Sequence, residues 1–429
     1  MITPQHTFTG FGFGPIQAGL FVKEAHQSGN FAKIVVAEID QHLVDALRAN
    51  KGSYYVNVAK ADGIEVLKID NVQLLNPNVA DDRRVILQTL DQSTEIATSL
   101  PSVDFYDSGT PTCTASLIAD GLKKSKANAA IVYTAENNNQ AAEILQRSVT
   151  EKLDAAPPNP VQFLNTVIGK MSRVVTDSSE IAQLELTPIS PDIKRAFLVE
   201  EFNRILIDRT TIPGFKPGFE VFIEKDHLLP FEQAKLYGHN AIHALLGFLG
   251  AVKGATSMTE LRGDSSIMRI GRKALLEESG GALIKKYSYL GDDLFTKDGF
   301  TSYAEDLLKR ITNPYLRDTI ARACRDVLRK LGLNDRIFGT MALALEHDIE
   351  PTNMALGAMA AIAVLLEEAQ EGDLPDSLRS SDWRQLNNAE IETIIRWIWN
   401  DQTGKYSDQL IEYVQNAQKH LIALLKGCH

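Results

Sequence analysis

The sequence is poor in cysteine and has no long apolar run. Cys113, Cys324 and Cys428 are the only cysteines among 429 residues, and they show no metal-ligand spacing. Such a set indicates neither a disulfide framework nor a zinc site, so we expect a reducing, cytoplasmic setting and no metal. No segment reaches the roughly 18 apolar residues that cross a bilayer, and the first residues do not have the pattern of a secretion signal. We therefore expect no membrane partner.

Basic charge is also scarce. The chain has 44 Lys and Arg against 55 Asp and Glu, a formal net charge of −11, and nowhere contains five like charges in a row. A nucleic-acid partner is therefore not expected. A hydrophobic content of 44% and a charged content of 23% are those of an ordinary globular protein, and the length suits two domains.

The first half of the chain alternates apolar runs with helical spacing. Strands are expected within 6–14, 33–40, 103–109 and 129–137, and strand-like alternation also marks 57–75, 83–89 and 161–176. Alternation of strands with helices is typical of βαβ units and a parallel sheet. From about Val199 the pattern becomes helical, beginning with 199–209 and continuing through 230–254, 302–311, 315–331, 353–370 and 390–402. We predict an α/β domain over 1–198 and a mainly α-helical domain over 199–429.

A glycine-rich turn follows the first expected strand. Gly10, Gly12 and Gly14 precede a helical stretch that opens with Pro15, Ile16 and Gln17. A dinucleotide loop needs such glycines, because the backbone must turn tightly and approach a pyrophosphate at a helix N-terminus. Gln17 stands where the usual third glycine would be, so the motif alone is weak evidence.

An acidic residue stands at the distance that this loop requires. Glu38 lies 24 residues after Gly14, at the end of the run 33–40, where a carboxylate would bind the adenosine ribose hydroxyls. No Arg or Lys follows at 39–41 to meet a 2′-phosphate, which favours NAD over NADP. The alternative is a glycine-rich turn beside a surface glutamate.

One helical segment carries an amine, an amide and an imidazole. On an α-helix, Lys235, Asn240 and His243 fall at about 0°, 140° and 80°. Burial beside a positively charged nicotinamide would lower the pKa of the lysine, which could then accept the proton of a secondary alcohol without a metal. Asn240 and His243 would hold the developing alkoxide. The alternative is an amphipathic helix with a snorkelling lysine and a core histidine.

These residues resemble the long-chain polyol-specific dehydrogenases, the mannitol dehydrogenase family. The likeness covers nearly the whole chain: the glycine loop at Gly12, the second strand at 33–40, the element AENN after the run 129–134, and the segments 163–175, 199–209, 235–254 and 310–337 follow in the family's order. Lys235, Asn240 and His243 match its catalytic residues. The resemblance implies a Rossmann-type N-terminal domain that binds NAD, followed by a mainly helical substrate domain.

The resemblance also implies further site residues. Glu136 and Asn137 would bind cofactor, with Asn137 also near the substrate, and Arg322 and Lys330 would approach the substrate. Glu232, three residues before Lys235, could relay the proton to solvent. The cations of 322–336 could instead pair with Asp318, Asp326 and Asp335. Gly169 departs from the family, which usually has aspartate there, and this puts the usual specificity in doubt.

The expected function is an NAD-dependent, metal-independent oxidoreductase that interconverts a sugar alcohol and a ketose. The segment 310–337 is most similar to family members that act on a polyol phosphate such as mannitol 1-phosphate. A hexuronate reductase, or a non-catalytic NAD-binding sensor, are the alternatives. We expect a monomer or a small homo-oligomer with a sugar alcohol or sugar phosphate as its partner.

Overall fold

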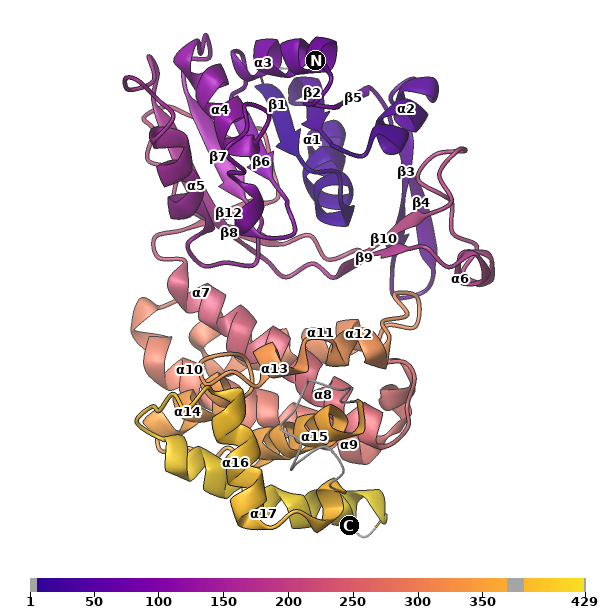
Figure 1. Ribbon diagram of the computed structural model, residues 1–429, viewed down its shortest axis with the longest axis vertical. Helices are drawn as coiled ribbons and strands as arrows, with labels where there is room; N and C mark the ends of the chain where they lie inside the picture. Colours follow the sequence, from indigo (N-terminus) through magenta and orange to yellow (C-terminus); the bar gives the residue numbers. More distant parts are fainter. Residues whose placement is uncertain (1–5, 369–381, 428–429) are drawn as a thin grey trace. The chain divides into compact units, whose positions relative to one another are not determined.

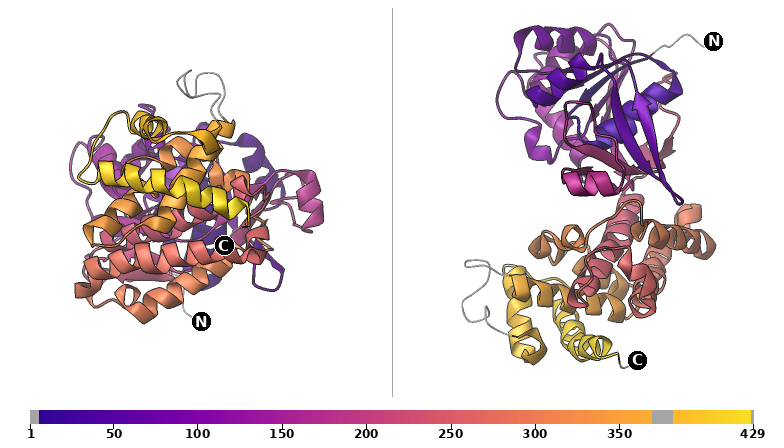
Figure 2. Two further views of the ribbon diagram at one scale, coloured as in Figure 1. Left: turned by 90° about the horizontal axis from the view of Figure 1, so that it is seen from below. Right: turned by 90° about the vertical axis from the view of Figure 1, so that its right-hand side faces the viewer.

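The chain forms two compact units, residues 1–232 and 233–429. The computed structural model describes residues 6–368 and 382–427, so the expected helix end at 369–370 and Cys428 lie outside the described residues. The first unit combines two sheets with helices, whereas the described part of the second consists of helices and loops (Figures 1 and 2).

An eight-stranded sheet forms the centre of the first unit. Its order is β12-β11-β8-β7-β6-β1-β2-β5. The six strands from β8 to β5 run parallel, and β11 and β12 run antiparallel to β8. The strands are β1 (His6–Phe11), β2 (Phe31–Ala37), β5 (Val72–Leu75), β6 (Glu95–Thr98), β7 (Ala130–Thr134), β8 (Val161–Ile168), β11 (Ile205–Asp208) and β12 (Phe222–Lys225). The parallel Rossmann-type sheet is confirmed, and its order reverses between β1 and β6.

Both faces of this sheet are buried, which explains its apolar strands. On β2, Ile34 and Val36 join one core while Val35 and Ala37 join the other, because alternate side chains point to opposite faces. One core includes α3 (Ala80–Leu90), α4 (Thr114–Lys123) and α5 (Ala141–Thr150). The other includes α2 (Gln41–Ala49) and a helix that begins at Pro15, continues as a π-helix over Gln17–Val22 and ends with α1 (Lys23–Ser28).

A second, four-stranded sheet closes the latter core. Its order is β4-β3-β10-β9, from β3 (Tyr54–Ala59), β4 (Ile64–Ile69), β9 (Ser172–Val175) and β10 (Ala196–Glu200); α6 (Ser178–Gln183) lies between the last two. Gly19 allows β10 to approach the π-helix, since a Cβ there would lie 2.6 Å from a methyl carbon of Val199. The predicted strand-like segment 57–75 contributes to both sheets, since β3 and β4 belong to the second sheet and β5 to the first.

Three predictions of secondary structure in the first unit are wrong. The segment 103–109 contains a short 3-10 turn, and the strand is Glu95–Thr98 instead. The segment 83–89 belongs to α3, which has Asp81 and Asp82 in its first turn. The segment 199–209 holds the end of β10 and β11, where Ile205 and Ile207 are buried with the period of two that a strand requires.

The unit boundary follows from this last difference. The expected boundary at 198/199 falls inside β10, whereas the compact units divide after Glu232. The antiparallel pairing of β11 with β8, and the pairing of β12 with β11, keep 205–225 within the first unit.

The second unit packs its helices around α8 (Ala241–Val252), nine of whose twelve residues are buried. Gly247 lets α12 pack closely, since a Cβ there would lie 2.6 Å from the Cβ of Ala323. The other helices are α7 (Leu229–Gln233), which leads into α8, α9 (Ser265–Lys273), α10 (Gly280–Tyr287), α11 (Lys297–Ile311), α12 (Ile320–Cys324), α13 (Val327–Lys330), α14 (Phe338–Glu346), α15 (Thr352–Glu368), α16 (Asn388–Ile398) and α17 (Ser407–Leu425).

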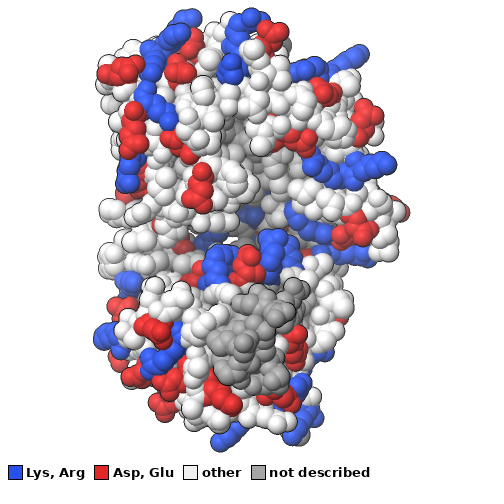
Figure 3. Space-filling view, viewed as in Figure 1, with Lys and Arg blue, Asp and Glu red and all other residues white. Residues whose placement is uncertain are grey.

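Among residues 6–368 and 382–427, no helix has the length and apolar character needed to cross a membrane. On the face drawn in Figure 3, acidic and basic side chains are interspersed.

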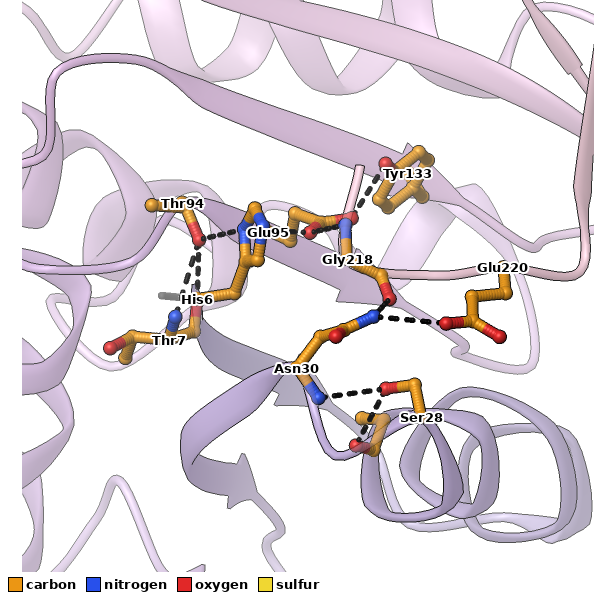
Figure 4. A network of polar contacts seen from close by, with 10 residues as sticks. His6, Thr7, Ser28, Asn30, Thr94, Glu95, Tyr133, Gly218 and Glu220 are labelled. Carbon is orange, nitrogen blue, oxygen red and sulfur yellow. Dashed lines mark hydrogen bonds and ion pairs between the residues drawn. The ribbon is translucent and has the colours of Figure 1, made fainter. Parts of the chain in front are cut away.

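A buried carboxylate anchors the β11–β12 connection at the amino end of β6 (Figure 4). Glu95 accepts hydrogen bonds from Gly218 N at 2.6 Å and from the Tyr133 hydroxyl at 2.8 Å. His6 Nδ1 lies 3.2 Å from the same carboxylate. Burial raises the pKa of Glu95 to about 7 and lowers the pKa of His6, so burial outweighs the attraction between them.

This network predicts a stability that falls as pH rises. Because the pKa of Glu95 is about 7 in the folded state and 4.5 for an ordinary glutamate, the folded state holds an extra proton between these two pH values. The free energy of unfolding should therefore drop through this range, by up to roughly 3 kcal/mol well above pH 7. Glu95→Gln should flatten the profile, measured by urea unfolding at pH 5 to 8.

Glu220→Gln is the matched control, because Glu220 is an exposed carboxylate of the same network. Its profile should follow the unmodified protein. A Glu95→Gln profile as steep as that of the unmodified protein would contradict the assignment.

Candidate functional site

The glycine loop lies at the carboxyl ends of β1 and β6, where the strand order reverses. Gly12 has φ +78°, and a Cβ there would lie 2.8 Å from the carbonyl oxygen of Ser99. A Cβ on Gly14 would meet no atom within 4 Å. The helix begins at Pro15, so Ile16 and Gln17 have the first free backbone N–H groups. This tight turn, open space and set of donors fit a pyrophosphate.

Gln17 takes the third glycine position with its side chain turned inward. The side chain is fully buried, and neither amide atom has a hydrogen-bond partner among the described residues. A Cβ on Gly10 would lie 1.8 Å from Gln17 Nε2. Gly10 therefore leaves the space that Gln17 fills.

Glu38 is held against this loop by backbone donors. Phe13 N donates to Oε2 at 2.7 Å and Asp40 N donates to Oε1 at 2.9 Å. Each carboxylate oxygen has a second lone pair with which it can accept a hydroxyl. Large apolar side chains are exposed after the neighbouring strands: Ile39 after β2, Val79 after β5 and Phe105 after β6. This edge of the sheet thus offers both polar and apolar contacts to a ligand.

Glu136 is buried at the end of β7 and its carboxylate binds protein groups. It accepts from Thr98 Oγ1 at 2.9 Å, from Leu100 N at 2.7 Å and from the Tyr106 hydroxyl. Burial raises the pKa of Glu136. Its contacts fix the chain after β6, which forms one wall of the glycine loop, whereas the next residue, Asn137, is exposed.

The predicted catalytic helix contains a π-helix over Ala234–Asn240. Lys235 and Asn240 are five residues apart, which is the spacing of π-helical hydrogen bonds. Their side chains therefore share one side of the helix, rather than diverging by the roughly 140° of an α-helix. Both residues are half-buried, and Glu232 is buried three residues before Lys235. The Asn240 side-chain amide has no hydrogen-bond partner within the part of the chain that the structure describes.

His243 contacts a buried aspartate that the sequence did not indicate as a site residue. Asp318 lies before α12, and its Oδ2 is 2.6 Å from His243 Nε2. Arg322 donates to the same carboxylate through Nε at 2.6 Å and Nη2 at 3.1 Å. Burial alone would raise the pKa of Asp318, but His243 and Arg322 hold it well below its usual range. Since an ionised carboxylate only accepts, His243 carries a proton on Nε2 and offers Nδ1 to a ligand.

The cations of 322–336 make the ion pairs that the alternative interpretation predicted. Besides Arg322 with Asp318, Arg329 lies 3.4 Å from Asp326 and Arg336 lies 2.8 Å from Asp335.

The expected single helix 315–331 is wrong. It breaks into α12 and α13 at Asp326, whose φ is +60°. Lys330 is buried and donates to the carbonyl oxygen of Ala323 at 2.7 Å, which satisfies the end of α12. Burial lowers the pKa of Lys330 to about 8.

The departure at Gly169 lies immediately after β8, beside a buried lysine. Lys170 donates to the carbonyl oxygens of Glu200 and of Phe202, the latter at 2.8 Å.

Among the described residues, no group of three or more His, Cys, Asp and Glu side chains is arranged to hold a metal ion.

The fold is a Rossmann-type unit joined to a helical unit that carries a lysine, an asparagine and a histidine on one helix. Residues 227–420 match the model of the mannitol dehydrogenase C-terminal domain. The helical unit is thus similar to the C-terminal domain of the mannitol dehydrogenase family.

Individual proteins that are similar to this chain point to the same group. Mannitol-1-phosphate 5-dehydrogenases of Buchnera aphidicola subsp. Acyrthosiphon pisum, strains Tuc7 and APS, are 25% identical over 355 residues, 82% of this chain and 84% of each relative. The structure of Pseudomonas fluorescens mannitol 2-dehydrogenase, in ternary complex with NAD and D-mannitol, matches with a TM-score of 0.69 at 15% identity. A substrate-free D-sorbitol dehydrogenase matches with 0.75 at 15% identity. Each alignment covers 99% of this chain and 94% of the other, and these two likenesses establish the fold.

The contact between Gly10 and Gln17 predicts strong coupling. Gly10→Ala should lower the free energy of unfolding by about 2 kcal/mol, because its Cβ would overlap the Gln17 amide. In a Gln17→Ala background the same change should cost at least about 1 kcal/mol less. Urea unfolding of the four proteins measures this, with Gly63→Ala as a control, since a Cβ on Gly63 meets nothing within 4 Å. Additive effects would contradict the contact.

Proposed function

We propose that the protein is an NAD-dependent polyol dehydrogenase in which Lys235 is the general base. The observation that carries this proposal is the π-helix that aligns Lys235 with Asn240, one turn before a histidine oriented by Asp318. The similarity of residues 227–420 to the mannitol dehydrogenase C-terminal domain supports a polyol as the substrate class. The loop from Gly12 to Gln17 would bind the pyrophosphate of NAD, and Glu38 would bind the adenosine ribose.

The helix residues perform the proton chemistry of alcohol oxidation. When bound, NAD accepts the hydride from the substrate carbon. Lys235 would accept the hydroxyl proton as the general base. Asn240 donates to the developing alkoxide. Glu232, on the same helix, passes the proton from Lys235 to solvent.

Asp318 acts on this chemistry through His243. With its Nε2 proton donated to Asp318, the neutral ring accepts a substrate hydroxyl at Nδ1. The carboxylate also stabilises the protonated ring, which donates at Nδ1. Asp318 is thus a positioning residue that fixes the orientation and tautomer of His243.

Replacement of the base should abolish most turnover. Lys235→Ala should reduce the rate of polyol oxidation at least about a hundredfold while the Kd of NAD stays within about twofold, because a base contributes to the chemical step. Steady-state rates and calorimetric NAD titration test this. Lys253→Ala, a lysine directly after α8, is the control. Activity that survives in Lys235→Ala, or that is lost on addition of a chelator, would reject a metal-independent lysine base. NAD binding without turnover of any polyol would favour the non-catalytic sensor.

Loss of the Asp318 charge should change the pH profile. Asp318→Asn should lower kcat/KM at least about tenfold and change its pH profile, because the imidazole of His243 loses the carboxylate that fixes its tautomer. Glu392→Gln is the control, since it breaks an i,i+4 pair with Arg396 that has the spacing of Asp318 and Arg322. Lower thermal stability with an unchanged pH profile would assign Asp318 a purely structural role.

We further propose a polyol phosphate as the substrate, on the basis of the relatives named mannitol-1-phosphate 5-dehydrogenase. Arg322 and Lys330 are the candidate cations. Arg322 uses Nε and Nη2 on Asp318, and Lys330 uses one of its three donors on Ala323, so each has donors left for a phosphate.

The enzyme should reduce fructose 6-phosphate with NADH at a higher kcat/KM than free fructose. Arg322→Gln and Lys330→Gln should raise KM for the phosphorylated ketose more than for fructose, a ratio that cancels any general loss of folded protein. Arg329→Gln, an exposed cation of α13, should leave the ratio unchanged. Faster reduction of free fructose would reject the phosphate proposal, and faster reduction of fructuronate would favour the uronate reductase.

A further inference from the structure

Residues 39–41 contain no Lys or Arg, but the fold places an arginine beside Asp40, two residues after Glu38. Arg195 Nη2 lies 2.5 Å from Asp40 Oδ2, across a separation of 155 residues. The backbone N–H of Asp40 itself donates to Glu38 Oε1. After the end of β2, the guanidinium of Arg195 therefore pairs with Asp40, whose backbone is hydrogen-bonded to the carboxylate of Glu38.

The segment before β10 delivers this guanidinium by packing against α2. Ile189 and Ile193 are buried in the core that includes α2, and Ser190 Oγ donates to the carbonyl oxygen of Ala46 at 3.4 Å. Ile189 N in turn donates to the carbonyl oxygen of Arg195 at 2.9 Å. The position of Arg195 beside Asp40 is thus fixed by packing, while its side chain is about one-third exposed and accessible to a ligand.

We infer that Asp40 is a second determinant of cofactor specificity, because it occupies the guanidinium of Arg195 that would otherwise bind a 2′-phosphate. This inference rests on the proposed NAD site. Glu38 excludes the 2′-phosphate by charge, and Asp40 pairs with a cation that could otherwise offset that charge. A planar guanidinium recognises phosphate well, so its release should matter more than the loss of one negative charge alone.

Calorimetric titration of two ligand pairs tests the inference without turnover: NAD against NADP, and AMP against adenosine 2′,5′-bisphosphate. In a Glu38→Ser background, adding Asp40→Asn should tighten binding of both 2′-phosphorylated ligands at least about tenfold. Asparagine can still cap α2, as Asp40 Oδ1 does for Leu43 N at 3.2 Å, so the helix should stay intact. Adding Arg195→Ala should cancel the gain.

Asp45→Asn in the Glu38→Ser background is the matched control. Asp45 is an exposed acid on the same helix, paired with Arg48. Its replacement should change these affinities less than about threefold. An equal gain from Asp45→Asn, or a gain from Asp40→Asn that persists with Arg195→Ala, would overturn the inference. Failure of the unmodified protein to bind NAD would instead reject the proposed function.

Discussion

The glycine loop and the His243–Asp318 pair each lie near a glycine at which two segments of the chain approach more closely than a Cβ would allow. At Gly12 the glycine loop meets the backbone of Ser99, which brings the ends of β1 and β6 together. At Gly247 helix α8 meets Ala323 of α12, one turn from His243. That second contact is what places Asp318 and Arg322 beside the imidazole. A side chain at either glycine would separate groups whose function depends on hydrogen-bond distances.

The sequence alone indicates most of the fold because the buried strands have a strong apolar signal. It predicts β1, β2 and β7 and the helical second unit. It fails at 83–89 and 199–209, where short apolar runs fit both periods and tertiary packing decides. Pairing of β11 with β8 turns the second of these into a strand, and the unit boundary moves with it.

Local spacing in the sequence is enough to indicate candidates such as Glu38 and Lys235, whose roles stay predictions. Local spacing could not indicate the roles of Asp318 and Arg195, because their partners are distant in the sequence. No pattern near residue 40 predicts that an arginine at residue 195 lies beside it. Arg322 and Lys330 show a related limit, since a sequence reveals their charges but not the protein groups that already bind them. The number of basic residues in a segment therefore overestimates the positive charge that is available to bind a ligand.

The π-helix at Ala234–Asn240 has a consequence for how this helix tolerates insertions and deletions. A π-helix holds one residue more per hydrogen-bonded ring than an α-helix. Deleting a single residue from it would relax the segment to α-helical geometry without breaking the helix. Everything after the deletion would then keep its packing against α12 and α15, while Lys235 and the residues before it would turn relative to Asn240. A one-residue deletion here would therefore change the relative direction of Lys235 and Asn240 while the helix after it stays folded.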